Sequence, residues 1–125
     1  MVEKMKDNGI IRTAKSGATR DTSINKAELV KYLSPIVIEA FGKYMLKHQI
    51  QADGTKRAGD NWKKGFGETP RETKDIIIDS LIRHTLDLWL EHDGYQSRDG
   101  LDEALGGLFF NVMAYWHTYL EENTQ

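Results

Sequence analysis

Three side chains that can bind a metal ion or move a proton lie along one flank of an expected helix, within the segment Asp79–Glu91. His84, Asp87 and Glu91 are spaced at i, i+3 and i+7, so in a helix they form one narrow polar stripe. Helical bundles present metal sites in this way, with carboxylates beside an apolar face and an imidazole one turn away. A surface helix whose polar flank faces water gives the same pattern, and both interpretations stay open at this point.

A second group of chemically able residues lies in the long connector 49–71. Trp62 stands there among cations that include Arg57, Lys63 and Lys64. An aromatic ring can stack on a nucleotide base while nearby cations hold its phosphates. Connectors of this length are usually functional or disordered. The alternative is that Trp62 packs the connector onto the helices and that the lysines are solvated.

The run Ser16–Thr22, with the sequence SGATRDT, is a third candidate. It offers hydroxyl groups, a glycine that permits close backbone approach, and Arg20, whose guanidinium can bind a phosphate in bidentate fashion. The run lies within residues 1–22, which lack periodicity and are expected to form a flexible, irregular arm. Flexible termini contain many such runs, so composition alone does not assign this one a function.

Residues 101–122 carry two stripes at helical spacing, one apolar and the other small and polar. In a helix interior, Gly106 and Gly107 each cost about 1 kcal/mol relative to alanine, so something should offset that cost. Close packing of another helix would do so, and so would room for a nucleotide. The small, polar stripe consists of Glu103, Gly107, Asn111, Ala114 and Thr118.

The first helix that positions these residues is expected over 26–48. Pro35 lies inside it, lacks a backbone donor and disfavours helical geometry at the residue before it. The sequence therefore predicts either a kink near Ser34 or two helices, 26–33 and 35–48.

The second and third helices are expected over 71–92 and 101–122. Thr69 or Thr73 can open the second helix, and Asp93–Gly94 ends it. With a short connection between them, these helices predict an all-α fold, an antiparallel helical bundle of three main helices. The arm 1–22 and a helical domain 23–125 are the expected division of the chain.

Each expected helix has an apolar face, and Trp89 and Trp116 are expected to be buried in the bundle. A small helical domain with several exposed aromatic residues often completes its core by self-association, so a homo-oligomer is expected. The apolar positions are Leu29, Val30, Leu33, Val37, Ala40, Phe41 and Tyr44, then Ile78, Leu81, Ile82, Thr85, Leu86 and Trp89, then Leu101, Leu105, Leu108, Val112, Tyr115, Trp116 and Tyr119.

Composition limits the function classes. The 125 residues predict one domain, and the net charge of −2 gives no reason to expect nucleic acid or a membrane as partner. The chain has no cysteine, which excludes disulfides and thiolate chemistry. Neither a membrane-spanning run nor a signal-peptide pattern is recognised, so a cytoplasmic location is expected.

Four motifs in order along residues 15–120, the third of them in two parts at 81–84 and 87–90, resemble the phage-associated dATP/dGTP diphosphohydrolase family. That family is similar in turn to the MazG-like all-α nucleotide pyrophosphohydrolases. The motifs are SGATRDT at 16–22, GDNWKKG at 59–65, LIRH at 81–84, DLWL at 87–90 and NVMAYWHT at 111–118.

The resemblance implies a helical enzyme that cleaves dATP or dGTP to the monophosphate and pyrophosphate, in phage nucleotide metabolism within the host cytoplasm. The implied cofactor is Mg²⁺, for which Mn²⁺ can substitute; such an ion polarises phosphoryl oxygens and activates a bound water. MazG-like enzymes carry two acidic pairs on successive helices. Here His84 and Asp87 match the first pair and Glu103 begins the second, while Gly107 stands where MazG-like sequences place an aspartate.

The expected site residues follow from this match. Asp87, Glu103 and Glu91 are the expected metal ligands, Glu91 or Glu103 would take the proton, and His84 would orient the metal-bound water or contact a phosphate. Nucleotide binding is assigned to Ser16, Arg20, Asp21, Arg57, Asn61, Trp62, Lys63, Lys64 and Asn111.

The competing hypothesis is a helical module without enzymatic activity, which binds nucleotides or another protein. The missing aspartate at Gly107 favours this hypothesis, and the stripe of His84, Asp87 and Glu91 favours the enzyme.

Overall fold

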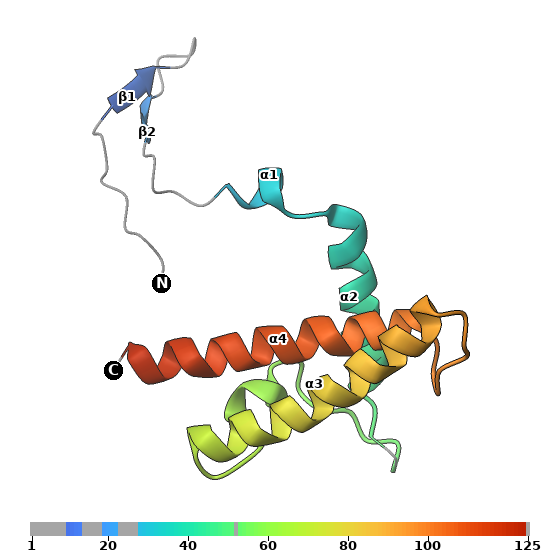
Figure 1. Ribbon diagram of the computed structural model, residues 1–125. Helices are drawn as coiled ribbons and strands as arrows, with labels where there is room; N and C mark the ends of the chain where they lie inside the picture. The colour runs from blue at the N-terminus through green and yellow to red at the C-terminus, as the bar shows by residue number, and fades with distance from the viewer. Residues whose placement is uncertain (1–9, 14–18, 23–27, 52, 125) are drawn as a thin grey trace. The chain divides into compact units, whose positions relative to one another are not determined.

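The computed structural model describes residues 10–13, 19–22, 28–51 and 53–124, and the chain divides into two compact units, Met1–Ser34 and Pro35–Gln125. The described part is predominantly helical, which confirms the all-α class (Figure 1).

The first unit contains two short strands and one helical turn. Strand β1 (Ile10–Thr13) pairs antiparallel with β2 (Thr19–Thr22), with Ile10 opposite Thr22. These segments are thus paired strands rather than the irregular arm expected over 1–22. Helix α1 (Leu29–Tyr32) follows.

The second unit begins with α2 (Pro35–His48), which starts at the proline. Leu33 is extended, with ψ of 145°, so the expected interruption is a true break between two helices. This outcome confirms the second of the two alternatives at its junction. Pro35 has no backbone N–H, so it cannot donate the hydrogen bond that would continue α1 into α2.

The two long helices, α3 (Pro70–His92) and α4 (Leu101–Asn123), agree closely with expectation. Thr69 is the N-cap of α3, and its Oγ1 accepts a bond from the backbone N–H of Glu72 at 3.1 Å. Gly94, with φ of +88°, ends the helix in the left-handed conformation that glycine tolerates best.

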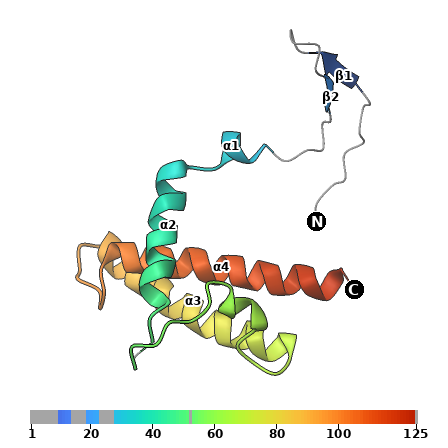
Figure 2. The same cartoon turned by 180° about the vertical axis from the view of Figure 1, so that it is seen from behind.

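Helices α3 and α4 lie side by side and antiparallel (Figures 1 and 2). Lys74 near the start of α3 forms an ion pair with Glu122 near the end of α4, and Asn111 bonds to Ser80 in the middle. Helix α2 crosses the first turns of α4, where Phe41 and Phe109 have ring centroids 4.5 Å apart.

The face that α3 buries is not the apolar face that the sequence predicted. Its buried residues are Thr73, Ile77 and Asp87, whereas Ile82 is 60% exposed and Trp89 is 64% exposed. The reason lies in the partner helix, whose small stripe of Ala104, Gly107, Asn111 and Ala114 lets α3 approach closely with its polar side.

Helices α2 and α4 likewise leave their apolar faces exposed. No residue of α2 is buried, and Trp116 on α4 is 57% exposed. The expected burial of Trp89 and Trp116 is therefore wrong for the single chain. Among the described residues the buried hydrophobic side chains are only Ile77, Ala104 and Ala114.

Candidate functional site

A cavity of about 550 Å³ lies where the end of α2, the connector 49–69, α3 and α4 meet. It brings together five residues that the sequence assigned to a site, although they come from three separate segments. These residues are Arg57, Asn61 and Trp62 of the connector, His84 of α3 and Asn111 of α4.

The connector forms one wall of the cavity, and its aromatic residues hold it against α4. Trp62 lies in the 3₁₀ helix η1 (Asn61–Lys64) and contacts Phe110 and His117 edge-on, with ring centroids 5.7 and 5.1 Å away. Trp62 thus packs the connector onto the helices, which confirms the packing interpretation. It also lines the cavity, and its stacking on a base stays a prediction.

Thr73 fixes the far end of the same wall. Its side chain is buried, and its Oγ1 accepts bonds from the backbone N–H groups of Phe66 and Gly67, at 3.2 and 3.0 Å. Two backbone donors of the connector are satisfied by one helix side chain, which holds Phe66 at the cavity.

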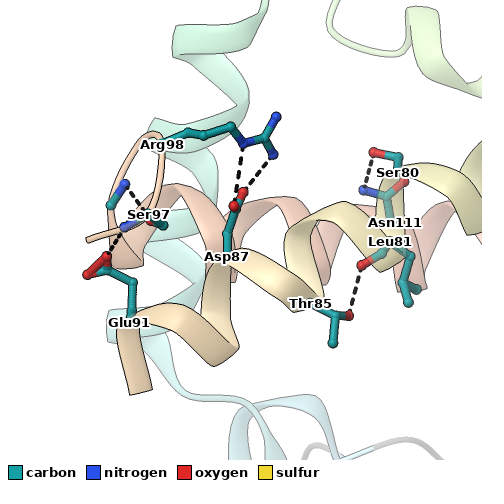
Figure 3. Close-up of polar contacts among 9 residues, drawn as sticks. Ser80, Leu81, Thr85, Asp87, Glu91, Ser97, Arg98 and Asn111 are labelled. Carbon is teal, nitrogen blue, oxygen red and sulfur yellow. Dashed lines mark hydrogen bonds and ion pairs between the residues drawn. The ribbon is translucent and has the colours of Figure 1, made fainter. Parts of the chain in front are cut away.

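The polar floor of the cavity is built by Asn111 and Ser80. The Asn111 side-chain Nδ2 donates to the Ser80 Oγ at 3.2 Å (Figure 3). It also donates to the Gly107 carbonyl at 2.7 Å. Asn111 is buried, so these bonds fix the orientation of its amide. Ser80 was not anticipated from the sequence, although it lies one turn before His84 on the same helix.

His84 lines the cavity, and its ring lies against Gly107 of α4. Burial lowers the pKa of its imidazole, the charges of Arg98 and Arg83 lower it further, and Asp87 opposes them. The ring is therefore neutral at neutral pH. Its Nδ1 is shielded from solvent and has no hydrogen-bond partner among the described residues.

The two glycines of α4 are explained by close packing. A Cβ atom added at Gly107 would lie 2.4 Å from the His84 Cε1, and one added at Gly106 would lie 2.4 Å from the Tyr44 Cδ1. The space is thus filled by side chains of this chain rather than left for a nucleotide. The same contact explains the missing aspartate, because a side chain at 107 would collide with the His84 ring.

Asp87, one of the three expected metal ligands, is bound by an arginine instead. Asp87 is 6% exposed, and its carboxylate accepts bonds from the Arg98 Nη2 at 2.7 Å and Nε at 3.4 Å (Figure 3). The bonds from Arg98 lower the pKa of Asp87, so the carboxylate is ionised at neutral pH. Arg98 lies in the loop after α3, and nothing in its sequence context marks it as this partner.

Glu91 and Glu103, the other two expected ligands, also have partners of their own. Glu91 accepts a bond from the backbone N–H of Ser97 at 2.8 Å (Figure 3). Glu103 accepts bonds from the Lys47 Nζ at 2.5 Å and the His48 Nε2 at 2.8 Å. Burial opposes ionisation of Glu103, but these two bonds outweigh it and lower its pKa.

The three carboxylates do not form one group. Within the described ranges, no three histidine, aspartate or glutamate side chains are placed so that they could hold a metal ion together. The donor set as it stands therefore does not fit a protein-held Mg²⁺.

Not all of the expected nucleotide contacts belong to the lining of the cavity. Lys63 and Lys64 are exposed and do not line it. Arg20 and Asp21 belong to β2 in the other unit, and Ser16 lies outside the described residues. The residues that sequence reasoning missed at the cavity are Tyr44, His48, Gln49, Ser80 and Arg83.

Comparisons of the chain with protein-family models, with curated proteins and with solved structures found no match. Among the described helices, none is both long enough and apolar enough to cross a membrane. Function therefore has to be inferred from the cavity and its residues.

Proposed function

We propose that the chain binds a purine deoxynucleoside triphosphate, dATP or dGTP, in the cavity and hydrolyses it to the monophosphate and pyrophosphate. One observation carries this proposal: the cavity gathers Arg57, Asn61, Trp62, His84 and Asn111, all of which the sequence had assigned to nucleotide chemistry.

The cavity has the size and the mixed lining that a nucleotide requires. Its volume of about 550 Å³ lies within the range of roughly 300–1,000 Å³ typical of ligand pockets. Trp62 and Phe110 offer aromatic surface to a base, and the amide of Asn61 can donate to and accept from its edge. The Nδ2 of Asn111 is already bonded to Ser80 and Gly107, so Asn111 offers its Oδ1 as an acceptor.

His84 is the group best suited to take a proton in this cavity. Its lowered pKa favours the neutral imidazole, which can accept the proton of an attacking water. In the proposed reaction a bond forms from that water oxygen to the α-phosphorus, the α–β anhydride bond breaks, and pyrophosphate leaves. Because water attacks the phosphorus directly, the reaction requires no covalent intermediate.

Mg²⁺, with Mn²⁺ as a substitute, is the cofactor that the family resemblance implies. Because Asp87 is held by Arg98 and Glu103 by Lys47 and His48, we derive no step through a protein-bound ion. The same pairing supports a second candidate function, in which the chain binds the nucleotide without turning it over.

One experiment separates these functions. The full chain is incubated with each NTP and dNTP plus Mg²⁺ or Mn²⁺, nucleotide products are separated by ion-exchange chromatography, and pyrophosphate is assayed. We expect dAMP or dGMP with pyrophosphate, and a loss of about 10²–10⁴-fold in rate for His84→Gln. His92→Gln, an exposed histidine at the end of α3, is the matched control.

The possible outcomes are distinct. Orthophosphate with a nucleoside diphosphate would mean cleavage at the other anhydride. Binding of dATP or dGTP without products would leave the binding function, and neither binding nor turnover would overturn the assignment of the cavity.

The proposed assembly is a homo-oligomer in which a second copy covers the exposed apolar faces and completes an antiparallel bundle. A groove of about 1220 Å³ between α2 and α4 is part of that surface and is lined by Val37, Leu105, Val112 and Trp116, among others.

A further inference from the structure

The cavity is lined by cationic side chains and by no acidic one. Arg57 and Arg83 both line it, and no aspartate or glutamate of the described residues does. A concave surface with permanent positive charge and no carboxylate attracts an anion and offers no charged ligand to a divalent cation.

The ion pairs of the second unit separate its arginines into two kinds. Arg71 is paired with Asp75 at 3.1 Å, and Arg98 is paired with Asp87 at 2.7 Å. Neither Arg57 nor Arg83 forms an ion pair within the part of the chain that the structure describes. Among the described arginines of the second unit, the two that line the cavity are thus the two without a carboxylate partner.

The backbone positions of these arginines are fixed. The Arg57 N–H donates to the Gln49 carbonyl at 2.9 Å, and the Gln49 Nε2 donates to the Arg57 carbonyl at 2.6 Å. Arg83 lies within α3, beside His84, whose pKa responds to its charge. Each guanidinium group is therefore attached to an ordered segment of backbone, Arg57 in the connector and Arg83 in α3.

We infer that Arg57 and Arg83 hold a phosphate or pyrophosphate group in this cavity directly, without a divalent cation. Guanidinium groups match phosphate oxygens in bidentate geometry, and arginine stays charged throughout the physiological pH range. This inference deepens the proposed function, because it assigns the phosphates of the nucleotide to a metal-free contact, but it does not depend on hydrolysis.

The test uses inorganic pyrophosphate as the probe, titrated calorimetrically into the full chain in buffer that contains EDTA. Wild-type protein is expected to bind it. Arg83→Gln and Arg57→Gln should each weaken binding by roughly tenfold to a hundredfold, the size expected for hydrogen bonds to a charged group. Arg71→Gln removes an equal charge from an exposed, paired arginine and should leave binding nearly unchanged.

Circular dichroism of each variant checks that it is folded. Pyrophosphate that binds only when Mg²⁺ is added would overturn the inference, as would an Arg71→Gln variant that is weakened as much as Arg83→Gln. Pyrophosphate binding in EDTA without any binding of dATP or dGTP would support the arginine contact while contradicting the nucleotide proposal, so the two can fail separately.

Discussion

At the scale of single residues, the buried carboxylate of Asp87 shows how this chain satisfies charge inside the α3–α4 pair. Arg98 binds it from the loop that joins the two helices, and Glu91 binds the backbone of Ser97 in the same loop. Ser97 in turn accepts a bond from the backbone N–H of Gly100, at 3.1 Å. These bonds determine how the loop turns from α3 into α4.

The Asp87–Arg98 pair predicts a specific response to acid. Because the folded-state pKa of Asp87 is lowered, its contribution to the free energy of unfolding is fully present above the unfolded-state pKa of about 3.9 and is lost as pH falls through the folded value. Arg98→Gln should lower the melting temperature at pH 7, and the difference from wild type should shrink as pH falls below about 4.

Thermal melts followed by circular dichroism between pH 7 and pH 3 measure this difference. Arg71→Gln is the control, since its pair with Asp75 is exposed and exposed pairs contribute little. A difference between wild type and Arg98→Gln that stays constant down to pH 3 would show that Arg98 acts through packing rather than through the charge of Asp87.

At the scale of elements, α3 and α4 pack through small and polar residues, and Gly107 is the closest point. Gly107→Ala should gain about 1 kcal/mol of helix propensity. It should lose about 1–3 kcal/mol through overpacking, because the new Cβ would lie 2.4–2.5 Å from three atoms of the His84 ring. The loss through overpacking exceeds the gain in helix propensity, so we expect a net decrease in the free energy of unfolding.

Denaturant unfolding measures this change, and Gly42→Ala on α2 is the matched control. A Cβ at Gly42 meets nothing within 4 Å, so that variant should be more stable than wild type by up to about 1 kcal/mol. An increase in stability for Gly107→Ala would mean that the His84 ring can move aside without cost.

The ends of these elements could be predicted from the sequence because their signals are local. Thr69, Pro35 and Gly94 act within a few residues of themselves through capping, a missing donor and left-handed geometry. The buried face of α3 could not be predicted in the same way. Its identity depends on Gly107 of another helix, whose small size makes a polar stripe the better packing surface.

Part of the candidate site could also be predicted from signals that are local in the sequence. His84 and Asn111 share helix faces with their expected neighbours, and Trp62 belongs to a connector whose composition suggested a ligand. The partners of the carboxylates could not be foreseen. Arg98 reaches Asp87 from 11 residues away, and Lys47 reaches Glu103 from 56 residues away, distances at which sequence spacing carries no signal.

At the scale of the whole molecule, the apolar faces of α2, α3 and α4 are the feature that a single chain does not explain. Leu86 on α3 is 53% exposed and Val112 on α4 is 51% exposed, while only three hydrophobic residues of the described chain are buried. A core that small is unlike that of a stable domain of this length. A second copy would supply the missing contacts, because a stable interface buries about 800 Å² on each partner and the exposed side chains span three helices.

Self-association through these faces predicts a mass in solution larger than that of one chain. Light scattering during size-exclusion chromatography should give at least twice the 14.3 kDa mass of one chain. Leu86→Glu and Val112→Glu each place a charge on an exposed apolar face and should shift the mass toward that of one chain, with a lower melting temperature. Ile50→Glu is the control, because Ile50 is equally apolar and 60% exposed but lies in the connector, outside these faces. A wild-type mass of 14.3 kDa at micromolar concentration, with a sharp melting transition, would show that the single chain is stable with its apolar faces in water and would remove the homo-oligomer from the proposal.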